Sequence, residues 1–253
     1  MIDFLKNHPF EIEAFFESSI VLSFAVPKDL LADLIPECLE LDTFQDKWGF
    51  VAVAMVQTKN LRPKGFPKFL GNDFFLIGYR VFVRYESRSG KRLRGLYILK
   101  SETDKLKMQF LGNVFTHYKY STTDINITHE GGLMNIISVR SGIELTIDTK
   151  RIQPALPEGS PFSDWKEARR FAGPLPFTFS FDEKRKQVLI IEGMRENWQP
   201  QPISVQGVRV GFFEELRLKN SLLANAFEVK NIPYIWKKGR IEQWPQTETD
   251  FKV

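Results

Sequence analysis

Three lysines gather near the middle of the chain, where an apolar strand-like run passes into a short helix-like segment. Lys100 ends the run RLRGLYILK, and Lys105 and Lys107 follow in SETDKLKMQF. A lysine amine attacks a carbonyl group only when it is partly neutral, which requires desolvation or nearby positive charge. Lys105 falls in the first predicted helical turn, where the helix dipole disfavours the ammonium form. Lys105 is therefore the candidate catalytic residue, as an amine nucleophile.

The same lysines have a simpler interpretation. Asp104 and Glu102 stabilise the ammonium form and so oppose the effect of the helix dipole. Ser101 to Asp104 also has the spacing of a capping box, which predicts a helix start at this point. On the residues alone, surface lysines that flank an amphipathic helix are the favoured interpretation of the pattern.

Arginine, tyrosine and histidine side chains on the neighbouring strands could bind a carboxylate. In YRVFVRYE, Arg80 and Arg84 share one strand face. Tyr97 lies on the return strand, and NVFTHYKYSTT predicts a further strand with His117 and Tyr118 on opposite faces. Guanidinium groups match carboxylates in shape and charge. We predict that Arg80 or Arg84 holds a carboxylate and that His117, with Tyr118 or Tyr97, supplies hydrogen bonds. The pattern does not decide which strand faces point into the cavity.

Other site chemistries have weaker signals. The basic hairpin from Arg88 to Arg94 could contact phosphates, but neighbouring acids dilute it and the net charge is only +4, so nucleic acid is not the expected partner. The three histidines are scattered, and His129-Glu130 is followed by two glycines instead of a second histidine, so no metal site is predicted. Neither a phosphate-binding glycine loop nor a G-x-S-x-G motif occurs, and we expect no cofactor.

Composition and patterning indicate one β-rich domain spanning residues 1–253. The chain is 43% hydrophobic and contains 23 phenylalanines, which pack well on pleated surfaces, and its single Cys38 excludes an internal disulfide. Strand-like segments dominate, with three or four short helices between them. The predicted fold is mostly β (β-dominated α+β), a large antiparallel sheet closed or half-closed into a barrel. No leader or membrane-length apolar run is visible, so we expect a cytoplasmic protein without a membrane partner.

Several motifs occur in an order that resembles a known family. They are the helix-like VPKDLLADLIP, the strand-like LELDTF, the loop RPKGFP, the arginine-bearing YRVFVR, and KSETDKLKMQFLGNVFTHYKY. This order resembles the YqjF-like family, uncharacterised bacterial proteins grouped with the acetoacetate decarboxylase-like fold. The resemblance covers most of the chain from about Val21 to Thr123 and, more loosely, the ending AFEVKNIPYIW.

The resemblance implies a large antiparallel barrel or cone with a central cavity, often in a homo-oligomer. In the decarboxylase itself a lysine forms a Schiff base with a β-keto acid, and an adjacent lysine lowers its pKa. The comparable place here reads Thr103-Asp104-Lys105-Leu106-Lys107, so only Lys105 carries over, without the adjacent lysine or the preceding proline.

These observations leave three functional hypotheses. The leading one is an acetoacetate decarboxylase-like protein that binds a small organic acid or a hydrophobic carbonyl compound in a central cavity, with or without lyase chemistry. The second is a non-catalytic ligand-binding or assembly protein on the same barrel. The third is nucleic-acid binding through the basic hairpin.

Overall fold

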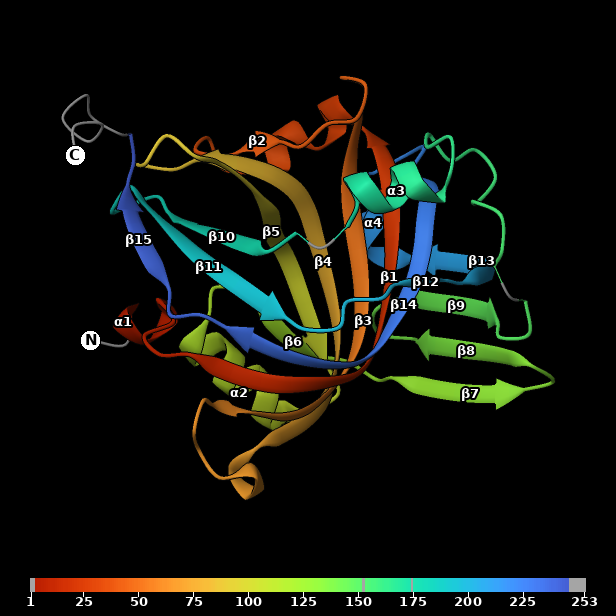
Figure 1. Ribbon diagram of the computed structural model, residues 1–253, viewed down its shortest axis with the longest axis horizontal. Helices are drawn as coiled ribbons and strands as arrows, with labels where there is room; N and C mark the ends of the chain where they lie inside the picture. The colour runs from red at the N-terminus through yellow and green to blue at the C-terminus, as the bar shows by residue number, and fades with distance from the viewer. Residues whose placement is uncertain (1–2, 152, 174, 246–253) are drawn as a thin grey trace.

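The computed structural model describes residues 3–151, 153–173 and 175–245 (Figure 1). Across these residues the chain forms an eleven-stranded sheet, a separate four-stranded sheet and short helices. The strands are β1 (Ile12–Pro27), β2 (Glu40–Leu41), β3 (Trp48–Pro63), β4 (Asn72–Glu86), β5 (Arg92–Thr103), β6 (Tyr120–Thr122), β7 (Asn126–Glu130), β8 (Leu133–Ser138), β9 (Ile143–Asp148), β10 (Phe177–Asp182), β11 (Gln187–Arg195), β12 (Gln201–Pro202), β13 (Ser204–Val210), β14 (Leu222–Trp236) and β15 (Arg240–Gln243). The helices are α1 (Asp3–Lys6), α2 (Leu106–Phe115), α3 (Trp165–Phe171) and α4 (Gly211–Glu215).

The large sheet returns to its own first strand. Its order runs β14-β1-β3-β4-β5-β10-β11, and β11 pairs again with β14 in the register Gly193↔Trp236. Neighbours in this ring are antiparallel except for β5 and β10, which run parallel. The predicted mostly-β class and the large, cone-like sheet are therefore confirmed, with this parallel pair, and the parallel β5–β6 pair, as the departures from an antiparallel order.

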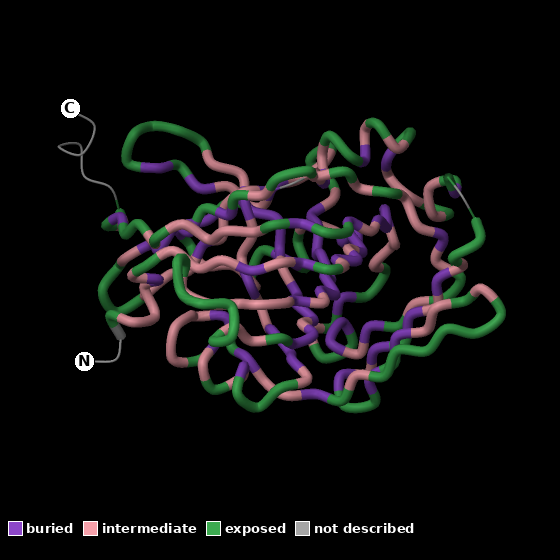
Figure 2. Tube along the Cα trace, turned by 60° about the horizontal axis from the view of Figure 1, so that its bottom comes forward, coloured by how far each residue is buried: buried purple, intermediate pink, exposed green. Residues whose placement is uncertain are grey.

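The two faces of the large sheet pack against different apolar clusters. On β3, Val51, Val53 and Met55 join the main core, to which the small sheet contributes Ile136 and Leu145. Residues between them on β3 point to the other face and belong to separate apolar clusters. Both faces of β3 are covered, as its two-sided apolar sequence predicts. Figure 2 shows buried residues along the central strands and exposed ones at the loops.

The segment around α2 differs from its prediction. Strand β5 continues to Thr103 because it pairs with β4 as far as Leu76↔Thr103 and with the parallel strand β6. These pairings keep Ser101 to Thr103 in the sheet, so no capping box forms there. The helix begins after Lys105, whose side chain makes no cap hydrogen bond, and ends at Phe115.

The strand predicted for NVFTHYKYSTT is mostly absent. Its first residues end α2, residues 116–119 form a loop, and only Tyr120–Thr122 join the sheet. None of the described helices is long and apolar enough to cross a membrane.

Candidate ligand-binding site

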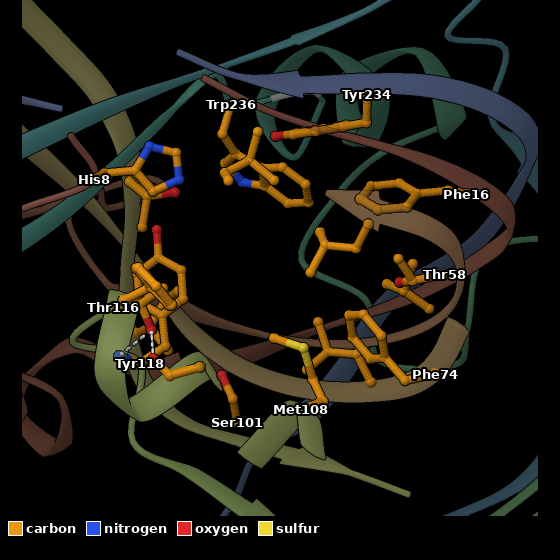
Figure 3. A pocket seen from close by; sticks show the side chains of 18 of the residues that line it. His8, Phe16, Thr58, Phe74, Ser101, Met108, Thr116, Tyr118, Tyr234 and Trp236 are labelled. Atoms are coloured by element: carbon orange, nitrogen blue, oxygen red, sulfur yellow. Dashed lines mark hydrogen bonds between the residues drawn. The ribbon is translucent and has the colours of Figure 1, made fainter. Parts of the chain in front are cut away.

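A cavity of about 370 Å³ opens on one face of the large sheet. Its walls come from β1, β3, β4, β5, β14, the helix α2 and the loop after α2 (Figure 3). Aromatic and aliphatic side chains such as Phe16, Phe74, Met108 and Trp236 form most of the surface. Pockets of roughly 300–1,000 Å³ with apolar walls and a few polar groups are typical of small-molecule sites.

Arg80 on β4 is the main charged group in this wall. Its Nε atom is buried and has no hydrogen-bond partner, and the exposed part of the side chain faces the cavity. Burial lowers the pKa of Arg80, and the charged or polar groups that raise it are the hydroxyls of Tyr234, Tyr120 and Tyr118. A guanidinium stays protonated in proteins even so. No described carboxylate forms an ion pair with Arg80.

Gly78 makes room for this guanidinium. A Cβ atom at Gly78 would lie 3.0 Å from both Nε and Nη2 of Arg80, closer than most real Cβ contacts. The arginine side chain therefore folds back over the backbone of its own strand. A residue two positions away, on the same strand face, fixes how Arg80 enters the cavity.

Arg195 at the end of β11 adds a second positive charge. Its guanidinium lies 4.7 Å from the ring centroid of Trp198 and 5.7 Å from that of Tyr234. Burial lowers the pKa of Arg195, and the nearby Arg80 lowers it further. No described carboxylate pairs with either arginine. An anion between or beside them would relieve both the repulsion and the desolvation cost.

Tyrosine hydroxyls surround Arg80 as neutral donors. Burial raises the pKa of Tyr118 and raises that of Tyr120 to about 12, so both phenols keep their protons at neutral pH. Thr178, which also lines the cavity, opposes this rise in the pKa of Tyr118. These hydroxyls can donate to a bound oxygen that Arg80 holds.

His8 reaches the same cavity from the N-terminal segment. Its Nδ1 lies 3.0 Å from the carbonyl oxygen of Lys237, which can only accept, so Nδ1 carries the proton. Burial lowers the pKa of His8, which favours the neutral ring. Its Nε2 is then an acceptor on the cavity wall, near Tyr118 and Trp236 (Figure 3).

The structure brings two of the predicted ligand-binding residues together. Arg80 and Tyr118 both line the cavity. Arg84 instead pairs with Asp42 at 2.5 Å, away from the cavity. Tyr97 packs against the main core on the opposite face of the sheet. His117 lies in the loop between two lining residues but is not itself part of the wall.

Lys105 lies outside the cavity. Its amine is 3.1 Å from the Asp104 carboxylate, and 56% of its side chain is exposed. The capping box predicted at Ser101 to Asp104 does not form, because β5 continues to Thr103 and the helix begins only at Leu106. Lys105 therefore lies just before the helix, with its side chain toward solvent. Across the described chain the cavity wall contains no lysine, and no group of three metal-ligating side chains occurs.

Sequence reasoning missed His8, Arg195, Tyr234 and Trp236. They come from the first and last parts of the chain and meet Arg80 because β14 pairs with both β1 and β11. The run NIPYIW on β14 carries the only local signal, since alternation places Tyr234 and Trp236 on one strand face.

The closed sheet, with the cavity on one of its faces, has an acetoacetate decarboxylase-like fold. The chain matches the acetoacetate decarboxylase of Legionella pneumophila over 92% of its length and 88% of the other chain, with 12% identity and a TM-score of 0.61. The enduracididine biosynthesis enzyme MppR, in complex with pyruvate, gives 10% identity over 92% and 90% of the two chains and a TM-score of 0.58. An acetoacetate decarboxylase-like enzyme of Sphingomonas wittichii RW1 gives 11% identity, 94% coverage of both chains and a TM-score of 0.57.

Within that fold, the chain belongs to the DUF2071 family, which is described as an uncharacterized conserved protein family and matches residues 14–248. The resemblance to the YqjF-like group is thereby confirmed. No curated protein matches the sequence. The structural likenesses lie below 25% identity and establish the fold.

Proposed function

We propose that this protein binds a small organic acid in the cavity, with the carboxylate on Arg80 and an apolar body against the aromatic wall. The observation that carries the proposal is a guanidinium in an apolar cavity without an acidic partner. Desolvating a charge costs several kcal/mol unless an opposite charge compensates it. A ligand carboxylate that accepts from Arg80 and from the Tyr118 hydroxyl provides that compensation.

The cavity's size favours an acid larger than pyruvate. At roughly 30 Å³ per water molecule in the liquid, about 370 Å³ corresponds to about a dozen waters. Pyruvate, which the related-fold enzyme MppR binds, has six non-hydrogen atoms and leaves part of this volume empty. Acids with a longer hydrocarbon part would also bury the apolar wall. A neutral carbonyl compound fits less well, since it leaves Arg80 without an anion.

A binding role is better supported than imine chemistry. A Schiff base needs an amine in contact with the ligand, and the described wall supplies none. The amine of Lys105 is exposed and paired with Asp104. We therefore favour a ligand-binding protein that keeps the decarboxylase-like cavity.

Calorimetric titration with matched ligands tests the acid proposal. Medium-chain 2-oxo acids and simple carboxylic acids are compared with the primary amide and alcohol of the same carbon skeleton. Binding of the acids and loss of binding for both neutral analogues is the expected result. Equal affinity for acid and amide would contradict the role of Arg80.

Borohydride reduction separates binding from imine chemistry. The protein is reduced in the presence of acetoacetate or pyruvate and analysed by peptide mass spectrometry, with Lys105→Ala as the control variant. We expect no adduct on Lys105. A Lys105 adduct that disappears in the variant would restore the Schiff-base hypothesis.

A further inference from the structure

Two segments next to cavity-lining residues carry large exposed apolar side chains. On α2, Leu106 and Phe110 are 76% and 68% exposed, and their i, i+4 spacing puts them on one helix face. In the loop between β3 and β4, Phe66 and Phe69 are 53% and 83% exposed, and Leu70 is 49% exposed. We call these five residues the rim patch. Clusters of large exposed apolar side chains are typical of interaction surfaces.

Both parts of the rim patch lie next to cavity-lining residues in the chain. The loop follows Arg62 and Pro63, which line the cavity, and α2 contributes Leu111 and Phe115 to the same wall. In Figure 1 the loop and α2 both project at the lower side of the molecule. The rim patch therefore lies on segments that border the cavity on this side.

The segments that carry the rim patch contain cations and no acids. Residues 60–71 contain Arg62, Lys64 and Lys68, and residues 105–123 contain Lys105, Lys107 and Lys119, without a single Asp or Glu. Some of these cations have partners from other segments, such as Lys64 with Glu11 at 2.6 Å. Lys68 and Lys107 are exposed and form no ion pair among the described residues.

We propose that the rim patch docks on an anionic lipid surface. Exposed Phe and Leu side chains enter the headgroup and upper acyl region, and neighbouring lysines interact with anionic headgroups; this combination is typical of interfacial binding. Such docking needs no membrane-spanning segment. It therefore revises the expectation of no membrane partner without requiring a spanning helix, and it does not depend on which ligand the cavity holds.

A second copy of the chain fits this surface less well. A two-fold contact brings the same patch of both copies together, so the cations of one copy come close to those of the other without an acid between them. That contact would also close the cavity opening. An anionic lipid surface instead satisfies the apolar residues and the cations at once.

Vesicle sedimentation tests the proposal. The full-length protein is mixed with vesicles of phosphatidylcholine alone or with about one-third phosphatidylserine. We expect at least about tenfold more bound protein on the anionic vesicles, and less at high salt because salt screens the attraction. Equal binding to both vesicles, or none, would overturn the proposal.

Exposed-residue variants locate the contact without disturbing the core. Phe69→Ser with Phe110→Ser removes the two most prominent aromatic side chains, and Lys68→Glu with Lys107→Glu reverses two charges. Each pair is expected to lower vesicle binding about tenfold. The control is Val139→Ser, which changes an 82% exposed residue in the small sheet's turn and leaves binding unchanged. Sedimentation velocity gives the competing outcome: a dimer that these variants abolish, without vesicle binding, would replace the lipid proposal.

Discussion

Arg80 and Arg84 lie four residues apart on one face of β4 and have opposite surroundings. Arg84 and Arg94 both pair with Asp42, at 2.5 and 2.6 Å, and Asp42 is 0% exposed. Arg94 also donates to the backbone carbonyl of Phe171 at 2.9 Å and lies over that ring. Arg80 has tyrosines, a second arginine and an apolar cavity, and no described acid.

The difference separates an arginine whose charge the protein itself neutralises from one for which we propose a ligand. Residue type, strand and face are the same at Arg80 and Arg84, so the sequence pattern cannot distinguish them. What differs is whether the protein supplies the anion. Where Asp42 does so, the ion pairs belong to the fold; where nothing does, we expect a ligand to provide it.

The largest expected effect is a loss of stability when Asp42, the acid that pairs with Arg84, is changed. Asp42→Asn leaves Arg84 and Arg94 without their carboxylate, and removing one partner of a buried ion pair costs about 3 kcal/mol or more. Because both arginines are partly exposed, we expect the lower end, about 3 kcal/mol, from urea unfolding. Acid binding in the cavity should be unchanged. A variant as stable as the wild type would mean that these ion pairs are not structural.

Gly78→Ala tests the surroundings of Arg80. The new Cβ meets Nε and Nη2 of Arg80 at 3.0 Å, so the guanidinium must shift. We expect acid affinity to fall about tenfold, or about 1.4 kcal/mol, by calorimetry. Gly207→Ala is the control, because nothing lies within 4 Å of its Cβ position. Equal affinities for the two variants would show that Arg80 does not depend on this space.

Tyr118→Phe should have a smaller effect on the same interaction. The loss of one neutral hydroxyl donor weakens acid binding by about 1 kcal/mol. Tyr97→Phe is a matched control, since Tyr97 packs on the opposite face of the sheet. If Tyr97→Phe weakened binding as much as Tyr118→Phe, the assignment of the cavity face would be wrong.

The alternation along β4 was sufficient to place Arg80 on one face together with Arg84, whereas Tyr118, predicted on a strand, lines the cavity from a loop. The alternation could not exclude Arg84, because the acid that neutralises it comes from the chain before β3. His8 and Arg195 were out of reach as well, since the pairing of β14 with both β1 and β11 brings these distant segments to Arg80. Lys105 lies outside the cavity because the helix begins later than the capping-box spacing predicts. Local patterns thus predicted most of the strands but not which of their faces line the cavity, whereas long-range pairing decided the composition of the cavity.

The pH dependence of stability gives the smallest expected effect. The pKa of His8 is lowered in the folded protein from its ordinary value of 6.5. The unfolded chain therefore binds more protons between that lowered pKa and 6.5, so stability is full above pH 6.5 and falls as the pH drops below it. Urea unfolding from pH 7 to 5 should show this loss, and His8→Gln should reduce it. His129→Gln, in an exposed strand, should leave it intact.

Arg80→Met tests the central claim most directly, with urea unfolding and acid titration on the same variant. We expect unfolding stability equal to or above that of the wild type, because an uncompensated charge is replaced by an apolar side chain. Acid affinity should fall about 100-fold, since loss of one charged partner costs about 2–5 kcal/mol. Arg92→Met, on the exposed end of β5, should change neither quantity. A large loss of stability in Arg80→Met with unchanged acid affinity would contradict the account.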